Sequence, residues 1–461
     1  MALEETLTRI DAQLPRFISQ LKEFVRIPSI STGDDPAAAA EVARAAAFLV
    51  EDLTRCGLTA RTVQATADSN PLVLAHPTAF RPDRPTVLVY GHYDVQGVEP
   101  SAWQHDPFAA VEEDGHLIGR GASDDKGQLW AHLKAAETVL AVEGELPVNL
   151  VFLLEGEEEC GSRGLARFLA DGGLKPFGRI LCTVISDTGM HGPGQPSLTL
   201  GLRGIVFTRM TVHGPSQDLH SGLFGGLVPN PNHLLVRALA ALTDQAGRVL
   251  VPGFYDEVRL PSTRERALYR ALEGSAADLL TGLGVEPLAG EEGFSLLERR
   301  WIRPSLDVHS LAGGSPRTVV PAQASATLSC RLVPDQRPER IQAGLEAFLR
   351  AQVPRSARVE FGPSHLAAPY TLELDHPLVE PALRALETGF GRKPVLVREG
   401  GSIPIAGDLA SSTGAPVLLV GFGQLTDNWH GPNERFSLAG FHAGVRTAAA
   451  LLYQLAGTDR S

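Results

Sequence analysis

Side chains that commonly bind metal ions stand at the ends of several apolar runs and in one motif near the C-terminus. These candidates are His92 and Asp94 in TVLVYGHYDVQ, Asp124 and Asp125 in GRGASDDKG, Glu158 and Glu159 in VFLLEGEEE, Asp187 in CTVISD, and His430 in NWHGPNE. Two imidazoles combined with carboxylates make a mixed nitrogen and oxygen set, which suits Zn²⁺, Mn²⁺ or Co²⁺ and needs no sulfur ligand.

Each of these groups alone has an ordinary structural explanation. A single histidine in a tight turn is more often a hydrogen-bonded structural residue than a metal ligand. Acids such as Asp124 and Asp125 are also favourable near the positive end of a helix dipole, and a run of glutamates suits a solvated loop. The metal interpretation is favoured because histidine, aspartate and glutamate all occur where neighbouring strands are expected to end.

The elements that must position these side chains alternate between strands and helices. The segments PLVLAH, TVLVYGHYDV, VNLVFLLEG and RILCTVISD are typical of strands, and the helical segment KGQLWAHLKAAETVLAVEG lies between the second and third. Helical periodicity also covers residues 3–25 and AAAAEVARAAAFLVEDLTRCG, where Gly57 supplies a C-terminal stop. This pattern predicts an α/β fold in which helices cover both faces of a mainly parallel sheet. In such sheets, functional groups collect at the carboxyl ends of the strands.

A second domain is predicted inside the first. The chain has 461 residues, which exceeds the size at which a single core usually stops growing. After residue 200, GIVFTRMTVHG and QASATLSCRLVPD alternate like half-buried antiparallel strands, and NHLLVRALAAL and ERIQAGLEAFLRAQV are helical. We therefore expect an α+β domain at residues 201–365, inserted into a discontinuous α/β domain formed by residues 1–200 and 366–461.

Composition excludes several classes of partner. The net charge of −12 argues against nucleic acid and anionic membranes, which would be repelled at long range. The N-terminal segment lacks the apolar core of a signal peptide, and no run approaches the roughly 18 apolar residues of a membrane helix, so a cytoplasmic location is expected. The cysteines are widely spaced without a CxxC pair, and they are expected to be reduced, mostly buried thiols: Cys56, Cys160, Cys182 and Cys330.

Several motifs together resemble a known family. The segments GHYDVQ, WQHDPF, GRGASDDKG, EGEEECGS, ISD, DLHSGLFGG and WHGPNE occur in the order found in the M20 metallopeptidase family. The sequence resembles in particular the branch of cytosolic dipeptidases similar to carnosinase, and the resemblance spans almost the whole chain. It implies an enzyme that hydrolyses dipeptides or short peptides with a free C-terminal carboxylate.

The resemblance also implies two divalent metal ions per subunit, with zinc expected first and manganese or cobalt as alternatives. Asp124 matches the ligand that bridges the two ions, which its two oxygens allow at a separation of about 3.5–4 Å. His92 and Asp187 would complete one site, and Glu159 and His430 would complete the other. Each ion would keep an open position, as a catalytic site requires.

Two further acids match supporting and catalytic positions of the family. Asp94 corresponds to the carboxylate that accepts a hydrogen bond from a metal-binding imidazole and fixes its tautomer. Glu158 corresponds to the general base, which takes a proton from the attacking water and returns it to the leaving amine. A base and a ligand at adjacent positions need a turn after the strand, and Gly156 makes such a turn plausible. Glu157 is expected to face solvent or the loop.

The inserted domain carries residues that resemble substrate contacts. His220, in DLHSGLFGG, matches a histidine that stabilises the tetrahedral oxyanion and that relatives often take from a second subunit, which implies a homodimer formed through this domain. Arg331, in LSCRLVP, matches an arginine that holds the C-terminal carboxylate of the substrate. The remaining matches are Thr318, Glu399, Gly401 and Ser402.

Three functions stay open at this point. Asp187 is aspartate where carboxypeptidase and deacylase branches tend to have glutamate, which favours a dipeptidase or aminopeptidase type. An N-acyl amino acid deacylase or desuccinylase would use the same metal chemistry, and the shape of an acyl pocket cannot be read from the sequence. A non-catalytic ligand-binding protein on the same fold is the third candidate, and the presence of Glu158 argues against it.

Overall fold

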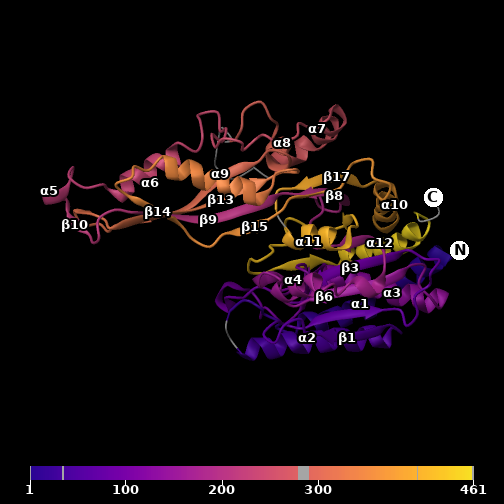
Figure 1. Ribbon diagram of the computed structural model, residues 1–461. Coiled ribbons are helices and arrows are strands. Elements are labelled where there is room, and N and C mark those ends of the chain that lie inside the picture. The colour runs from indigo at the N-terminus through magenta and orange to yellow at the C-terminus, as the bar shows by residue number, and fades with distance from the viewer. Residues whose placement is uncertain (1, 34–35, 279–289, 402, 459–461) are drawn as a thin grey trace. The chain divides into compact units, whose positions relative to one another are not determined.

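The computed structural model describes residues 2–33, 36–278, 290–401 and 403–458, and the chain forms two compact units (Figure 1). The first unit comprises Met1–Leu200, Leu372–Val397 and Asp408–Ser461, and the second comprises Gly201–Thr371 and Arg398–Gly407. The division thus places residues 366–371 and Arg398–Gly407, which were predicted to belong to the first domain, in the second unit. Each unit is described below by itself.

The first unit is built from alternating helices and strands. Its helices are α1 (Ala2–Val25), α2 (Pro36–Arg55), α3 (Lys126–Glu143), α4 (Arg163–Ala170), α10 (Val379–Phe390), α11 (Pro404–Thr413, which begins in the second unit) and α12 (Leu438–Ala456), with short 3₁₀ turns η1 (Pro100–Ala102), η2 (Glu158–Cys160) and η3 (Lys175–Phe177). Its strands are β1 (Thr59–Val63), β2 (Leu72–His76), β3 (Thr86–His92), β4 (Val111–Glu113), β5 (His116–Ile118), β6 (Asn149–Glu155), β7 (Ile180–Ile185), β18 (Val417–Leu419) and β19 (Arg435–Ser437), together with β8 (Ser197–Leu202) and β17 (Val395–Glu399), each of which has its last two residues in the second unit.

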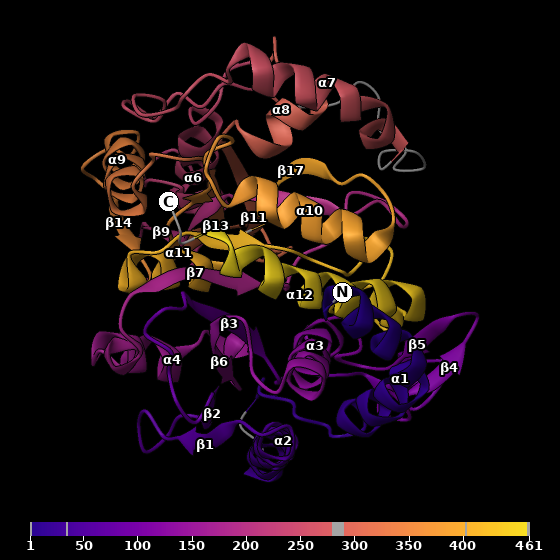
Figure 2. The same cartoon turned by 90° about the vertical axis from the view of Figure 1, so that its right-hand side faces the viewer.

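The large sheet of this unit runs in the order β1-β2-β6-β3-β7-β18-β8. The central strands β6, β3, β7 and β18 are parallel to one another, and antiparallel strands flank them. Every residue of β3 and β6 is buried, as expected for strands covered on both faces. Figure 2 shows α3 and α4 on opposite sides of β3 and β6. The predicted α/β fold with a mainly parallel sheet is therefore confirmed.

The register of the central strands aligns their carboxyl ends. His92, the last residue of β3, is paired with Glu155, the last residue of β6. Tyr90 of β3 is paired with Ile185, the last residue of β7. Side chains that follow these three strands therefore emerge along one edge of the sheet, where the candidate metal ligands stand.

A small sheet brings the C-terminal motif to the same region. Its order is β19-β5-β4, and Arg435 of β19 is paired with Ile118 of β5. The amide of Gly119 donates to the carbonyl oxygen of Glu434 at 2.9 Å. This pairing places the NWHGPNE segment beside GRGASDDKG, although about 300 residues separate them.

The second unit is an α+β structure around one sheet. Its strands are β9 (Gly204–His213), β10 (Leu219–His220), β11 (Ser305–Gly313), β12 (Val319–Val320), β13 (Gln323–Leu332), β14 (Arg358–Phe361), β15 (His365–Ala367) and β16 (Tyr370–Thr371), and its helices are α5 (Ser221–Phe224), α6 (Pro231–Ala240), α7 (Thr263–Asp278), α8 (Leu296–Trp301) and α9 (Pro338–Ala351). The antiparallel strands β11, β13, β9 and β14 form its main sheet. Alternate residues of β9 and β13 pack with apolar residues of α6 and α9 in the core of the unit.

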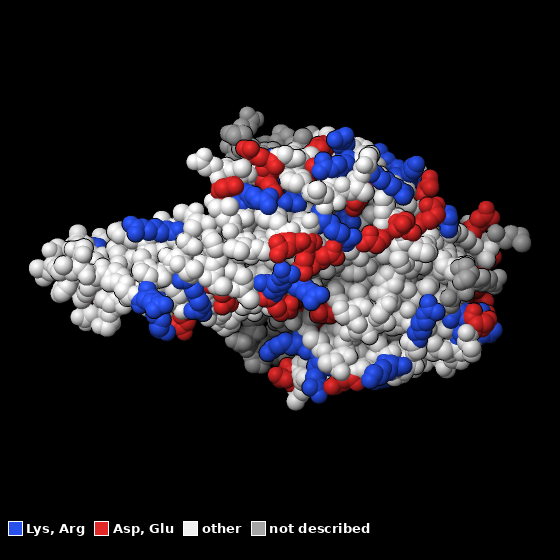
Figure 3. Space-filling view, turned by 45° about the horizontal axis from the view of Figure 1, so that its top comes forward, with Lys and Arg blue, Asp and Glu red and all other residues white. Residues whose placement is uncertain are grey.

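The surface carries charges of both signs. On the face drawn in Figure 3, lysine and arginine are interspersed with aspartate and glutamate. The charges on this face are mixed. The expected absence of a broad basic surface for nucleic acid stays a prediction. Among the described helices, none combines the length and apolar character that a membrane span requires.

Candidate metal centre

Two groups of ligand-type atoms in the first unit share Asp124. In one group, Nε2 of His92 lies 3.1 Å from Oδ1 of Asp124 and 3.9 Å from Oδ2 of Asp187. In the other, Nε2 of His430 lies 3.0 Å from Oδ2 of Asp124 and 3.3 Å from Oε2 of Glu159. Each oxygen of Asp124 thus faces a different histidine. The structure brings together all five residues that were predicted as metal ligands.

The Asp124 loop is fixed by a buried carboxylate that sequence reasoning did not select. Glu434 is fully buried and accepts hydrogen bonds from the backbone N–H groups of Gly121, Ser123 and Asp124 at 2.9, 2.9 and 3.0 Å. Nη1 of Arg120 donates to it at 2.8 Å. Glu434 belongs to the motif WHGPNE, so its place beside His430 was the available signal in the sequence.

His430 stands in a strained turn. Its φ of 58° lies in the left-handed region, as do those of Asn428 and Asn433, with φ of 63° and 58°. Non-glycine residues rarely adopt this region, and such strain is frequent at functional sites. Nη2 of Arg120 donates to the His430 carbonyl oxygen at 3.0 Å, and Nε1 of Trp429 donates to Oγ of Ser123 at 2.9 Å. These bonds keep the imidazole directed at Asp124.

Asp94 connects the imidazole of one group with the glutamates of the other. Its carboxylate accepts hydrogen bonds from the backbone N–H groups of Glu158 and Glu159 at 3.2 and 3.1 Å and from Oγ of Ser31 at 2.5 Å. Nδ1 of His92 lies 3.4 Å from its Oδ1 and 3.1 Å from its carbonyl oxygen. Asp94 therefore orients both the imidazole of His92 and the η2 turn, which is more than the predicted contact with the imidazole.

The glutamate run turns sharply after β6, as the roles predicted for the adjacent residues Glu158 and Glu159 require. Gly156 is needed at this turn because a Cβ there would lie 2.8 Å from the Tyr93 ring. Gln96 of GHYDVQ was not among the residues selected from the sequence, and its Nε2 donates a hydrogen bond to Oε2 of the predicted ligand Glu159 at 2.9 Å.

Two expectations about this run were wrong. Glu157 does not face solvent: it is buried, because its carboxylate accepts the backbone N–H groups of Asn70 and Gly164 at 2.9 and 2.7 Å. Cys160 was expected to be buried, but it is exposed at the end of η2, and Cys56 is only half-buried. Glu155, which had no assigned role, is buried and accepts hydrogen bonds from Tyr90 at 2.6 Å and from Ser162 at 3.0 Å.

The electrostatics of the cluster favour a bound cation. Burial, together with the charge of the neighbouring Asp124, raises the pKa of the Asp187 carboxyl to about 7. Burial also raises the pKa of Glu158, as do Asp187 and Glu159. Hydrogen bonds to Asp124 and Glu159 raise the pKa of His430 to about 10. Crowded buried carboxylates of this kind are stabilised when cations join them.

The donor set fits divalent ions such as Zn²⁺, Mn²⁺ or Co²⁺, because it offers imidazole nitrogens and carboxylate oxygens within 4.8 Å of one another in each group. Another acidic cluster, formed by Asp52, Cys56 and Glu137, does not fit a metal ion. Nζ of Lys134 lies 2.8 Å from Asp52 and 2.7 Å from Glu137, so an ammonium group already neutralises these acids.

Metal binding should release protons, because the metal-free cluster carries them at neutral pH. The raised pKa values of His430 and Asp187, about 10 and about 7, mean that His430 is protonated and Asp187 partly protonated near pH 7, whereas ligands must be deprotonated. We expect the apparent affinity for Zn²⁺ to increase from about pH 6 to about pH 8.

Calorimetric titration in buffers of different ionisation enthalpy would measure this release. Against the effect of burial, hydrogen bonds to Asp124 and Asp94 also raise the pKa of His92. We therefore expect roughly two to three protons per chain near pH 7, and about one fewer for His430→Gln. Heats that do not depend on the buffer would contradict this expectation.

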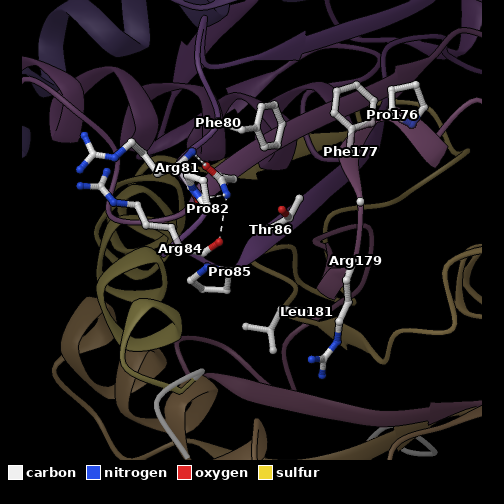
Figure 4. Close-up of a pocket in the computed structure, with 12 residues that line it drawn as sticks. Phe80, Arg81, Pro82, Arg84, Pro85, Thr86, Pro176, Phe177, Arg179 and Leu181 are labelled. Atoms are coloured by element: carbon white, nitrogen blue, oxygen red, sulfur yellow. Dashed lines mark hydrogen bonds between the residues drawn. The ribbon is translucent and has the colours of Figure 1, made fainter.

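The first unit also has a cavity of about 390 Å³ (Figure 4). It lies at the starts of β3, β6 and β7, since Thr86, Asn149 and Leu181 line it, whereas the predicted ligands His92, Glu159 and Asp187 lie at or beyond the ends of these strands. None of the predicted ligands lines it. Two of the three arginines that line it, Arg81 and Arg84, are paired with Glu145. The cavity is therefore separate from the candidate metal centre.

The predicted substrate contacts of the second unit fall into two groups. His220 and Thr318 lie together, because β10 pairs with β12 and the Thr318 carbonyl oxygen accepts the N–H of Ser221 at 3.0 Å. Arg331 lies near the other end of β13, close to Arg203. The backbone N–H of Arg203 donates to the carbonyl oxygen of Gly401 at 3.1 Å, so Gly401 lies in the same region. Glu399 ends β17, and Ser402 lies outside the described residues.

Comparisons with known proteins extend over almost the whole chain. A family model described as peptidase family M20/M25/M40 matches residues 88–454. The chain is 32% identical to the Cys-Gly metallodipeptidase dug1 of Schizosaccharomyces pombe, over 100% of this chain and 99% of that protein. It is 31% identical to the beta-Ala-His dipeptidase of Homo sapiens, over 98% of this chain and 93% of that protein.

Solved structures give the same correspondence. The crystal structure of human carnosine dipeptidase 1 matches with a TM-score of 0.83 at 30% identity, over 99% of both chains. The structure of the dipeptidase Dug1p from Saccharomyces cerevisiae matches with a TM-score of 0.82 at 31% identity, again over 99% of both chains. Sequence and fold are thus similar along the full length of these relatives.

Proposed function

This chain belongs to peptidase family M20/M25/M40 and is a metallopeptidase of the dipeptidase type, and we propose that it cleaves dipeptides or short peptides with a free C-terminal carboxylate at a two-metal centre. The observation that carries the proposal is the geometry of Asp124, whose two oxygens face different histidines at 3.1 and 3.0 Å. The relatives named for Cys-Gly and beta-Ala-His hydrolysis support small, unblocked substrates.

Five side chains would hold the two ions. His92 and Asp187 would bind one, Glu159 and His430 the other, and Asp124 would bind both. When bound, the cations would polarise the scissile carbonyl and lower the pKa of a water molecule. Zinc fits the nitrogen and oxygen donors best, with manganese or cobalt as alternatives.

Glu158 would move the proton. Its carboxylate takes a proton from the attacking water and then donates it to the nitrogen of the leaving amine. Burial raises its pKa, which brings a carboxyl group closer to the range in which it exchanges protons at neutral pH. Asp94 fixes the backbone of the base through the hydrogen bond from the Glu158 N–H group.

The spacing within the second unit supports a homodimer. Gln323 is paired with His213 at one end of β13, and Arg331 is paired with Ile205 near the other end. Eight residues of strand span about 26 Å, whereas an extended dipeptide spans about 7 Å. His220 lies beyond the Gln323 end, with α5 and β10 at one extremity of the unit (Figure 1). One dipeptide can therefore contact both His220 and Arg331 only if they come from different subunits.

The surface around His220 has the character of an interface. Leu223 and Leu227 are 69% and 78% exposed, and Phe224 between them is 39% exposed. Few charged side chains are visible at this extremity, on the left in Figure 3 as in Figure 1. The edge strand β11 is also exposed over most of its length, which leaves backbone groups open to a second copy. We propose that the partner subunit supplies His220 and Thr318 to the site.

Complementation between inactive variants tests this sharing. Glu158→Gln and His220→Ala should each lower kcat by about 10²-fold or more. Co-expressed, they should recover about a quarter of wild-type activity, because half of the random dimers contain one site with both residues intact. The matched control is Glu158→Gln with Arg331→Ala, which should not recover. Equal recovery in both mixtures, or in neither, would contradict donation of His220 by the partner.

The substrate class is tested with metal-loaded protein and a panel of dipeptides, N-acetyl amino acids and N-succinyl amino acids. We expect hydrolysis of dipeptides, loss of activity after chelation and recovery when Zn²⁺ or Mn²⁺ is added. Faster hydrolysis of the acylated amino acids would favour a deacylase or desuccinylase instead. Metal binding without hydrolysis of any member would favour a non-catalytic binding protein.

A further inference from the structure

The cavity at the starts of β3, β6 and β7 combines aromatic walls with positive charge. Its volume of about 390 Å³ lies in the range of small-molecule sites, which is roughly 300–1,000 Å³. Of its 12 lining residues, three are arginines and none is acidic (Figure 4). The proposed peptidase reaction uses none of them, so the cavity offers a separate place for a ligand.

An aromatic cluster forms one wall of the cavity. The ring centroids of Phe80 and Phe177 lie 5.7 Å apart, and the His76 ring packs against both at 5.8 and 5.4 Å. Phe177 is buried, whereas Phe80 is partly exposed. Leu181 and three prolines extend the apolar lining. A flat apolar group that covers these surfaces would remove them from water and stack on the rings.

Two of the three arginines shape the rim without being open to a ligand. The guanidinium groups of Arg81 and Arg84 both pair with Glu145, and Figure 4 shows them directed away from the phenyl rings. Nδ2 of Asn149 donates to the carbonyl oxygens of Arg81 and Arg84, at 2.9 Å in each case. This segment is therefore held in place before any ligand binds.

Thr86 and Arg179 supply polar groups that have no partner within the described parts of the chain. Thr86 is only 6% exposed, yet its hydroxyl makes no hydrogen bond to the described residues, although buried hydroxyls usually have a partner. Arg179 is exposed and forms no ion pair with them. Thr86 is paired with Ile180 on the neighbouring strand, about 4.8 Å away, and Arg179 directly precedes Ile180. One carboxylate can therefore accept a hydrogen bond from Thr86 and pair with the Arg179 guanidinium.

We propose that this cavity binds a small aromatic carboxylate, with its carboxylate at Thr86 and Arg179 and its ring against Phe80 and Phe177. The bound molecule would not be a substrate, because the strand from Thr86 to His92 spans about 20 Å and separates the cavity from the candidate metal centre. The inference goes beyond the proposed function and does not depend on it.

Calorimetric titration of the full, zinc-loaded chain with 3-phenylpropionate tests the site. The neutral 3-phenylpropanamide and the ringless propionate should each bind about tenfold more weakly or worse. Arg179→Gln should raise Kd about tenfold, and Thr86→Val, which keeps the shape of the side chain, about threefold. The matched control is Arg61→Gln, because Arg61 is an exposed arginine of β1 that pairs with none of the described residues and does not line the cavity. It should keep the wild-type Kd.

A parallel titration distinguishes this cavity from the proposed substrate contact at Arg331, which also suits a carboxylate. Arg331→Gln should leave Kd for 3-phenylpropionate unchanged. A Kd that rises in Arg331→Gln but not in Arg179→Gln would overturn the inference. Equal binding of propionate, an unchanged Kd in Arg179→Gln, or no binding to the wild type at about 10 mM ligand would overturn it as well.

Discussion

Glu158→Gln should reduce kcat for a dipeptide by roughly 10²- to 10⁴-fold while the metal content of the protein stays that of the wild type. The amide has the shape of the carboxyl group but cannot accept a proton from the attacking water. The predicted ligands of the two ions are other side chains, so the metal content measured by mass spectrometry and KM should change little. Steady-state kinetics on metal-loaded protein provide the test.

The matched control for this variant lies three residues earlier. Burial raises the pKa of Glu155 to about 8, so this carboxyl is mainly protonated near neutral pH, and glutamine imitates its neutral form. Its hydrogen bonds from Tyr90 and Ser162 can be accepted by an amide oxygen. Glu155→Gln should therefore keep most of the activity. A fully active Glu158→Gln would exclude this residue as the base, and loss of metal together with activity would make it a ligand.

The central sheet could be predicted because its signals are local. The apolar runs that became β3, β6 and β7 are long enough to require burial on both faces, and each turns polar where the strand ends. The small sheet of β4, β5 and β19 was not predicted, because its strands have three residues each and carry no periodic pattern. The segment Arg398–Gly407 lies too close to strands of the first unit in sequence for composition to show that it groups with the second.

The positions of the candidate ligands could be expected for a related reason. His92 and Asp187 stand at or just beyond the ends of parallel strands, so the topology that follows from alternating strands and helices already places them on one edge. His430 was a candidate by residue type, but only the family resemblance grouped it with the other ligands, since its approach depends on the pairing of β19 with β5. Their roles as ligands stay predictions until metal is measured.

The partners of the buried acids could not be read from the sequence. Glu157 was expected to face solvent because a run of acids is usually hydrated, but it accepts the N–H of Asn70, which lies 87 residues away. A carboxylate that accepts long-range backbone hydrogen bonds has the same local sequence as a solvated one. Only the folded chain distinguishes them, and the same holds for Glu434.

Replacing Glu434 should destabilise the first unit more than any other single change at the candidate centre. Its carboxylate accepts three backbone N–H groups and pairs with Arg120, whose side chain is 3% exposed. In Glu434→Gln, the buried guanidinium loses its counter-charge, and an amide N–H₂ group meets backbone donors. Breaking a buried ion pair on one side costs about 3–5 kcal/mol. Denaturant unfolding of the metal-free protein, followed through the transition of the first unit, would measure this loss.

A double variant separates two effects of replacing Glu434: the loss of the ion pair with Arg120 and the loss of the acceptor for the N–H groups of the Asp124 loop. If the cost of Glu434→Gln came only from the unpaired guanidinium, Arg120→Met combined with Glu434→Gln would restore most of the stability, because both charges are then removed. We expect recovery of only part of it, since the N–H groups of Ser123 and Asp124 still lack their acceptor. Zinc affinity should remain lowered in the double variant, because this loop positions the one carboxylate that both metal groups share. Glu387→Gln on the exposed face of α10 should stay within about 0.5 kcal/mol of wild type. Wild-type zinc affinity in the double variant would show that Glu434 stabilises the fold without positioning Asp124.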